Sequence, residues 1–129
     1  MPHPKEALLE ELYGRFGKGD MQGVLEMCTD DIVFHVPGNT PFSGDHTKAD
    51  FISGWIQKVM ELSGGTFGER AVIFIANDDH GIAVLDHWLE RDGKRIDYRV
   101  DHIWRFRGDK CCEWTERPGS EAEFERAWA

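Results

Sequence analysis

The residue best suited to chemistry in this sequence is His102, an imidazole that falls in a long stretch of alternating side chains. Between Ile96 and Phe106, alternate positions are apolar or aromatic apart from this histidine, and the positions between them are mostly charged. Successive residues of a β-strand point to opposite faces, so the pattern predicts a long strand with His102 on its aromatic face. An imidazole in such surroundings needs a hydrogen-bond partner and can change its protonation near neutral pH. A core histidine that is satisfied by a backbone carbonyl is the alternative explanation.

The elements that must position this strand divide the chain into a helical first part and a β-rich second part. Apolar side chains recur at helical spacing in residues 4–17, in a shorter segment that Asp20 caps, and in a third segment that ends after Leu62. From Thr66 onward the period of the pattern changes to two. We expect strands at residues 32–36, 71–76, 82–90, 96–106 and 111–116, and a short C-terminal helix that opens at the capping box Ser120–Glu123.

Turn signals mark the connections between these elements. Residues 37–45 contain Gly, Asn, Pro and Ser, which suit a turn-rich loop. Thr47–Asp50 resembles a capping box, with Asp in place of the usual Glu, and is expected to open the third helix. The Asp-Gly pair within residues 91–94 is a hairpin signal that joins two long strands.

Helices followed by hairpin-linked strands are typical of an α+β domain in which the helices cover one face of a curved sheet. Such a sheet leaves a cone with an open mouth, which is a natural pocket for an apolar small molecule. The 129 residues fit one domain, which we expect to span residues 1–129.

Charge and cysteine content exclude several classes of partner. A formal net charge of −9 makes nucleic acids and anionic membrane surfaces poor partners, because both would repel the protein. Three cysteines, without a signal peptide or a long apolar segment, fit the reducing cytoplasm. The six histidines and three cysteines show neither His-x-x-x-His nor Cys-x-x-Cys spacing, so we expect no bound metal and no cofactor.

Several short segments resemble the SnoaL-like group of the nuclear transport factor 2-like superfamily. These segments are Gly19-Asp20, Asp30–Val33 leading into Pro37-Gly38, Phe42–Gly44, Arg91–Lys94 and Trp104–Phe106. The resemblance covers nearly the whole chain and implies a cystatin-like cone, in which N-terminal helices pack on the concave face of a curved antiparallel sheet. The superfamily includes ketosteroid isomerases, polyketide cyclases and limonene-epoxide hydrolases, so the fold alone does not define a reaction.

The comparison with ketosteroid isomerases shows that their catalytic residues are replaced. The position of the base Asp holds Val36, and the position of the oxyanion-hole acid holds His102. The tyrosine of the first helix falls nearest Leu12, with Tyr13 one residue further and turned about 100° away on the helix. The resemblance therefore implies a pocket of the same shape that carries different groups.

The resemblance and the strand alternation together predict which side chains face this pocket. His102, with Glu116 or His87, is expected to perform general acid-base catalysis, which contributes roughly 10²–10⁴-fold in rate. The residues expected to bind the ligand are Tyr13, Phe16, Val36, Trp55, Tyr98, Trp104 and Trp114. Ordinary core packing is the alternative for Trp55 and Trp114.

These expectations favour an enzyme that works without a cofactor on an apolar cyclic or carbonyl compound, by isomerisation, cyclisation or dehydration. A non-catalytic ligand-binding or sensing protein with the same cone, and a scaffold whose pocket is filled by its own aromatic side chains, are the alternatives. The outer sheet face, with Trp88 and Ile103 among charged residues, predicts a homodimer. A solvated face with cross-strand ion pairs is the alternative there.

Overall fold

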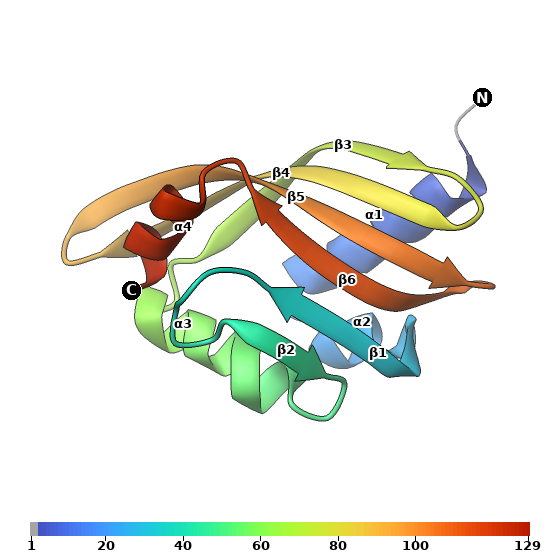
Figure 1. Cartoon of the computed structure of the whole chain (residues 1–129), viewed down its shortest axis with the longest axis horizontal. Helices are drawn as coiled ribbons and strands as arrows, with labels where there is room; N and C mark the ends of the chain where they lie inside the picture. Colours follow the sequence, from blue (N-terminus) through green and yellow to red (C-terminus); the bar gives the residue numbers. More distant parts are fainter. Residues whose placement is uncertain (1–2) are drawn as a thin grey trace.

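The computed structural model describes residues 3–129, which form a curved six-stranded sheet with helices packed against it (Figure 1). The strand order is β2-β1-β6-β5-β4-β3. The strands are β1 (Cys28–Val36), β2 (Gly44–Thr47), β3 (Gly68–Ala76), β4 (His80–Arg91), β5 (Lys94–Arg107) and β6 (Lys110–Pro118).

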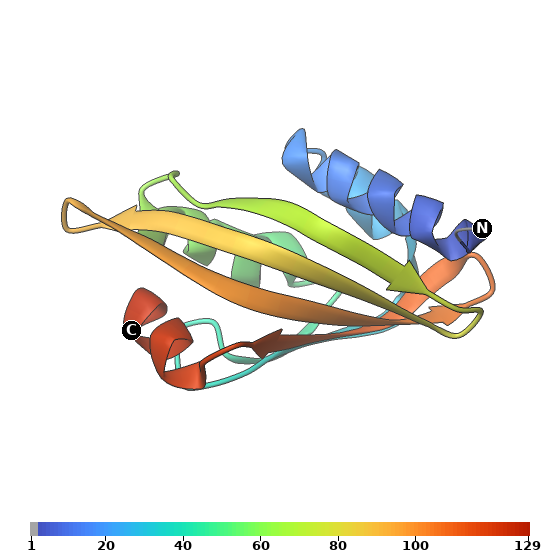
Figure 2. The same ribbon diagram turned by 90° about the horizontal axis from the view of Figure 1, so that it is seen from above.

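Helix α1 lies across one face of the sheet, over β3 and β4, as the view from above shows (Figure 2). The helical segments are α1 (Pro4–Gly17), α2 (Met21–Glu26), the π-helical turn η1 (Phe51–Ile56), α3 (Gln57–Ser63) and α4 (Glu121–Trp128). Helix α3 continues η1 and contacts β4, and α4 packs against β5 and β6. Within residues 3–129, no helix is both long and apolar enough to cross a membrane.

Helix α1 sits very close to the sheet because a glycine faces it. The side chain of His3 caps the helix by accepting a hydrogen bond from the backbone of Lys5. Leu9 is fully buried against the sheet at Gly81. A Cβ atom at Gly81 would lie 2.7 Å from the Phe106 ring and 2.8 Å from Leu9. The absence of a side chain at Gly81 therefore allows α1 to pack this closely against the strands.

The long hairpin of β4 and β5 has the register that the Asp-Gly signal predicts. Asp92 and Gly93 have φ angles of +54° and +74°, the left-handed values that a two-residue hairpin turn requires. This register pairs His87 with Tyr98 on the neighbouring strand. The pairing of β5 with β6 places His102 opposite Glu116. Turn chemistry thus brings polar residues from separate strands to the same face of the sheet.

The α+β architecture is confirmed, with one difference in the sheet. Strand β1 pairs antiparallel with β2 but parallel with β6, so the sheet is mixed. Parallel neighbours need a long crossover, and here the connection comprises the whole chain between Val36 and Lys110. Pairing over such a distance leaves no local signal in the sequence.

The predicted start of the third helix is wrong. Residues Gly44–Thr47, expected to lie in the loop and the capping box, form β2 and pair with the end of β1. The Asp50 carboxylate accepts a hydrogen bond from the Thr47 backbone N–H at 2.6 Å, so the capping contact exists as a tight turn. The helical backbone then begins at Phe51, because strand pairing holds Thr47 in an extended conformation.

The outer face of the sheet carries ion pairs across its strands, and Trp88 and Ile103 on it are partly exposed. Asp86 accepts hydrogen bonds from Arg70 and Arg99, each at 2.7 Å, across three neighbouring strands. Large apolar side chains are exposed at Val72, Ile73, Ile75 and Ile82. The homodimer through this face stays a prediction.

Candidate functional site

A cavity lies between the concave face of the sheet and the helices that cover it. Its volume is about 70 Å³. A site needs roughly 10–15 Å³ to accept one water, so this cavity is large enough for several waters or one small organic molecule. The walls are mostly aromatic and aliphatic. The titratable groups among the lining residues are Tyr13, Glu69, His87, Tyr98, His102 and Glu116.

One hydrogen-bonded chain, called here the Tyr13 relay, joins helix α1 to strands β5 and β6. The indole N–H of Trp104 donates to the Tyr13 hydroxyl at 2.9 Å. That hydroxyl lies 2.6 Å from Nδ1 of His102. Nε2 of His102 lies 3.1 Å from Oε2 of Glu116. His102 and Glu116 are both buried, so this end of the relay is shielded from bulk water, whereas Tyr13 is partly exposed.

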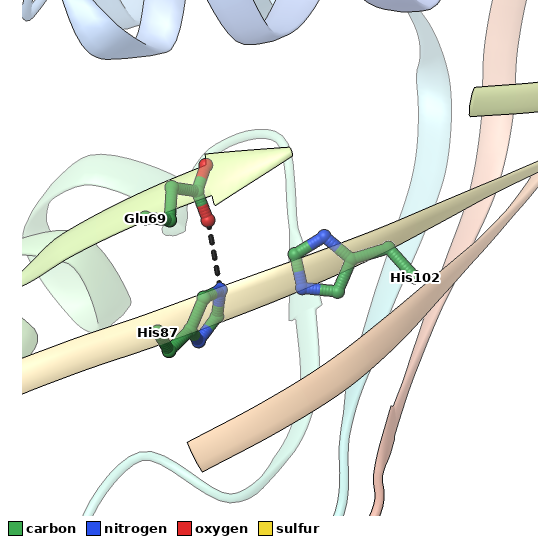
Figure 3. A group of neighbouring side chains, drawn as sticks. All are labelled: Glu69, His87 and His102. Atoms are coloured by element: carbon green, nitrogen blue, oxygen red, sulfur yellow. Dashed lines mark hydrogen bonds and ion pairs between the residues drawn. The ribbon is translucent and has the colours of Figure 1, made fainter. Parts of the chain in front are cut away.

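A second chain with the same sequence of groups, the Tyr98 relay, runs beside the first. The indole N–H of Trp128 donates to the Tyr98 hydroxyl at 2.8 Å. That hydroxyl lies 3.1 Å from Nδ1 of His87. Nε2 of the same ring lies 2.9 Å from Oε2 of Glu69 (Figure 3). The imidazole rings of His87 and His102 meet edge to face, with centroids 5.5 Å apart. Two Trp-Tyr-His-Glu chains therefore end in one cavity.

The donors and acceptors fix the direction of these chains when the imidazoles are neutral. An indole N–H can only donate, so the Tyr13 oxygen accepts from Trp104. The Tyr13 O–H then donates to Nδ1 of His102, and Nε2–H donates to Oε2 of Glu116. Every polar group is satisfied in this arrangement, and the same reasoning applies to the Tyr98 relay. Protonation of an imidazole would reverse the tyrosine bond and free the tyrosine hydrogen for a ligand.

The electrostatics keep the tyrosines protonated and Glu69 ionised. Burial raises the pKa of Tyr13 well above its usual value, and the negative charge of Glu69 raises it further. Burial also raises the pKa of Tyr98. Burial acts to raise the pKa of Glu69, but the hydrogen bond with His87 and the charges of both imidazoles outweigh it, so this pKa lies below the usual value.

The cavity holds two buried carboxylates without a permanent cation beside them. Its lining, within residues 3–129, includes Glu69 and Glu116 but no Lys or Arg. A buried carboxylate is costly unless a positive group or hydrogen-bond donors compensate it. The groups that can do so are His87 and His102.

The three predicted catalytic residues come together at the cavity. His87, His102 and Glu116 are each at least 95% buried, and all line it. The predicted ligand-binding residues that also line it are Tyr13, Phe16, Trp55, Tyr98, Trp104 and Trp114. Their catalytic and binding roles stay predictions.

One residue expected to bind the ligand does not line the cavity. Val36 is buried but lies at the end of β1, outside the cavity wall. Phe34, two residues earlier on the same strand face, contributes to the wall instead. Tyr13 was expected about 100° from the helix position of the isomerase tyrosine, and its hydroxyl nevertheless reaches His102. The buried arc of an amphipathic helix is at least about 100° wide, so the adjacent positions Leu12 and Tyr13 both face the sheet.

Sequence reasoning missed Glu69. The strand expected from Ala71 onward is longer in the structure, because β3 begins at Gly68 and pairs Glu69 with His87. A bulge between Ala71 and Ile73 shifts the register, so the apolar run beyond it gives no guide to the face of Glu69. Glu69 lies two residues before Ala71, and residues two apart on a strand share a face. This spacing was the one signal in the sequence that could have placed Glu69 on the cavity side.

The comparisons with known proteins agree with this architecture. The profile of the SnoaL-like domain family matches residues 9–114. The chain therefore belongs to the SnoaL-like domain family, as its sequence segments suggested. A comparison with curated proteins gave no match.

Solved structures confirm the cystatin-like, nuclear transport factor 2-like fold. Bal32a, from a soil-derived mobile gene cassette, is 23% identical with a TM-score of 0.86, and the match covers 95% of each chain. A Xanthomonas campestris protein described as having a cystatin-like fold is 22% identical with a TM-score of 0.84, over 95% of this chain and 96% of that one. TerC, co-crystallised with polyporic acid, is 18% identical with a TM-score of 0.83, over 97% of this chain and 98% of that one.

Proposed function

We propose that the protein is an enzyme that moves a proton on a small, mostly apolar carbonyl or cyclic compound, in an isomerisation, cyclisation or dehydration. The observation that carries this proposal is the Tyr13 relay, a partly buried tyrosine in hydrogen-bond contact with a buried histidine and glutamate at the wall of a cavity. A hydroxyl, an imidazole and a carboxylate in this order can take up and return a proton.

The proposed step uses His102 as the proton acceptor. The Tyr13 oxygen accepts a proton from the substrate while the hydrogen of its own hydroxyl passes to Nδ1 of His102. Glu116 stabilises the resulting imidazolium through Nε2–H, and the reverse transfer returns the proton at another atom of the substrate. The raised pKa of Tyr13 means that a free phenolate is avoided, so the two transfers occur together.

The Tyr98 relay is suited to a complementary role. Its hydroxyl and His87 line the same cavity, so one relay can remove a proton while the other supplies one. A 1,3-shift or a dehydration needs such a pair, because the proton leaves one atom as another is protonated.

The lining also indicates the class of substrate. Aromatic walls favour a flat or cyclic apolar compound. The two carboxylates and the lack of Lys or Arg in the lining, within residues 3–129, disfavour an acidic substrate. The structural similarity to TerC, which was crystallised with polyporic acid, supports a cyclic compound.

Hydrogen-deuterium exchange into model compounds tests the proposal. Protein freed of metal by a chelator is incubated in D₂O with a panel of flat, enolisable apolar ketones and lactones. Proton NMR then follows the loss of the signal next to the carbonyl. We expect catalysed exchange with the wild type, a loss of about 100-fold or more in His102→Gln, and no change in His35→Gln on the outer face.

Two results would overturn the proposal. One is exchange that survives in His102→Gln, which would place the chemistry elsewhere. The other is a compound that stabilises both proteins against heat but exchanges in neither. That result would identify a ligand-binding or sensing protein with the same cavity.

A further inference from the structure

We propose that Glu69, His87 and His102 form a binding site for one divalent transition-metal ion of the Zn²⁺ type. The three residues come from three adjacent strands, β3, β4 and β5, and their side chains converge in the cavity (Figure 3). The expectation of no metal rests on the lack of a local ligand motif in the sequence. In the structure, strand pairing brings the three ligands together although they are far apart in the chain.

The donor atoms suit such an ion in type and spacing. Two imidazoles and a carboxylate are the protein ligands of many zinc sites that keep an open position. One ligand atom from each residue lies within 4.8 Å of the others. Tetrahedral bonds of 2.0–2.1 Å separate ligand atoms by about 3.3 Å. Nε2 of His87 and Oε2 of Glu69 are already 2.9 Å apart, and the ligand atom of His102 lies within 4.8 Å of the other two, so His102 has to move closer to them.

The hydrogen bonds around the imidazoles orient the same nitrogen of each ring toward the ion. Nδ1 of His87 is bonded to Tyr98, and Nδ1 of His102 is bonded to Tyr13. A metal-bound histidine typically donates its other N–H to such a partner, which fixes the ring. Nε2 is therefore the ligand atom that we propose for both rings. Nε2 of His87 already faces Glu69, whereas Nε2 of His102 faces Oε2 of Glu116 at 3.1 Å and has to turn toward the ion. Glu116 is outside the group of three, so the fourth position stays open.

Charge balance gives a second, independent reason. Glu69 and Glu116 place two carboxylates in a cavity whose lining, among the described residues, contains no Lys or Arg. A divalent cation held by the two imidazoles and Glu69 would bring positive charge next to a carboxylate in a cavity without Lys or Arg, among the described residues.

The metal and the proton relay exclude each other. A metal ion at Nε2 requires the remaining proton to sit on Nδ1, which then donates to Tyr13 instead of accepting its proton. The metal-bound protein therefore cannot carry out the step proposed above. Binding is measured by its own readout, so the two proposals succeed or fail separately.

Titration with Co²⁺ and Zn²⁺ tests the site directly. The protein is treated with a chelator and dialysed, Co²⁺ is added while its visible spectrum is recorded, and Zn²⁺ binding is measured by calorimetry. We expect one ion per chain, a Co²⁺ spectrum typical of four or five ligands, and displacement of Co²⁺ by Zn²⁺. Glu69→Gln and His87→Gln should each weaken Zn²⁺ binding by more than about 100-fold, the upper end for loss of an outer contact.

The control is His35→Gln, which removes an imidazole that also contacts two carboxylates, those of Asp45 and Glu113, but lies on the outer face. It should bind the ion as the wild type does. Tyr98→Phe should weaken binding by about 10–100-fold through the orientation of His87. This variant keeps all ligands, and circular dichroism checks that every variant is folded. Absence of stoichiometric binding to the wild type, or loss of binding in His35→Gln alone, would overturn the proposal.

Discussion

The Tyr13 hydroxyl lies 2.6 Å from Nδ1 of His102, although the two residues are 89 positions apart in the chain. Tyr13 belongs to the N-terminal helix and His102 to the longest strand. The contact forms because Gly81 lets α1 lie directly on the sheet. The same hydroxyl also accepts the indole N–H of Trp104, so one oxygen links the helix to two side chains of β5.

Removal of this hydroxyl should reduce both stability and proton transfer. In Tyr13→Phe, the N–H of Trp104 and Nδ1 of His102 lose their partner in a buried site. We expect the free energy of unfolding to fall by about 1–3 kcal/mol, measured by urea denaturation. Deuterium exchange of the substrate should fall by at least about 10-fold.

Tyr98→Phe is the matched control, because it removes the corresponding hydroxyl between Trp128 and His87. Tyr98→Phe should lower the free energy of unfolding by a similar amount. It should reduce the rate of deuterium exchange less than Tyr13→Phe does. Equal losses of exchange in both variants would contradict the assignment of the first proton transfer to the Tyr13 relay.

Strand alternation, together with the family resemblance, predicted part of the site. His87 and His102 lie on β4 and β5, which pair without interruption, so the period of two determines which side chains share a face. The hairpin turn at Asp92-Gly93 fixes the alignment of these two strands. Glu116 lies on β6, where alternation predicts its face although a bulge at Arg105–Phe106 shifts the register with β5.

The rest of the site depends on contacts that the local pattern does not contain. Glu69 reaches His87 only through the register of β3, which a bulge changes. The orientation of Tyr13 depends on how α1 crosses the sheet, and the parallel pairing of β1 with β6 depends on packing of the whole chain. Each of these three features depends on tertiary packing. Helical or strand periodicity in the sequence therefore could not predict them.

A pair of glycine substitutions tests how α1 is positioned. In Gly81→Ala, the new Cβ would meet the Phe106 ring at 2.7 Å and Leu9 at 2.8 Å. We expect the free energy of unfolding to fall by about 1–3 kcal/mol from overpacking. In Gly14→Ala, the same atom is added within α1 where nothing lies within 4 Å. This control should gain roughly 0.5–1 kcal/mol, since alanine favours the helix. An unchanged stability in Gly81→Ala would show that α1 is held elsewhere.

The pH dependence of stability should report the His35 pair on the outer face. The hydrogen bond to Asp45 at 2.7 Å raises the pKa of His35, partial burial opposes this, and the contact with Glu113 at 2.8 Å adds to it. The hydrogen bond with His35 lowers the pKa of Glu113. The folded state therefore favours a charged His35, and this contribution is complete below the unfolded pKa of about 6.5. It is lost as pH rises through the folded pKa.

Urea denaturation of the wild type and His35→Gln at a series of pH values measures this contribution. The difference in unfolding free energy between the two proteins should be largest near about pH 5–6, above the usual pKa of Glu113 and below that of the histidine. It should shrink toward about pH 9. Asp45→Asn keeps the imidazole and should reduce the dependence on pH. A difference that is constant with pH would contradict the ion pair.

Filling the cavity should abolish ligand binding and leave the fold intact. Val59 of α3 is buried and lines the cavity, so Val59→Phe adds an aromatic ring in the space open to a ligand. Any overpacking costs about 1–3 kcal/mol. A ligand at about 100 times its dissociation constant should stabilise the wild type by roughly 2.7 kcal/mol, and this gain should vanish in the variant.

Val72→Phe is the control, because Val72 is exposed on β3 and the same added ring leaves the cavity unchanged. Thermal unfolding with and without ligand gives both values, and a ligand that stabilises Val59→Phe as much as the wild type must bind outside this cavity.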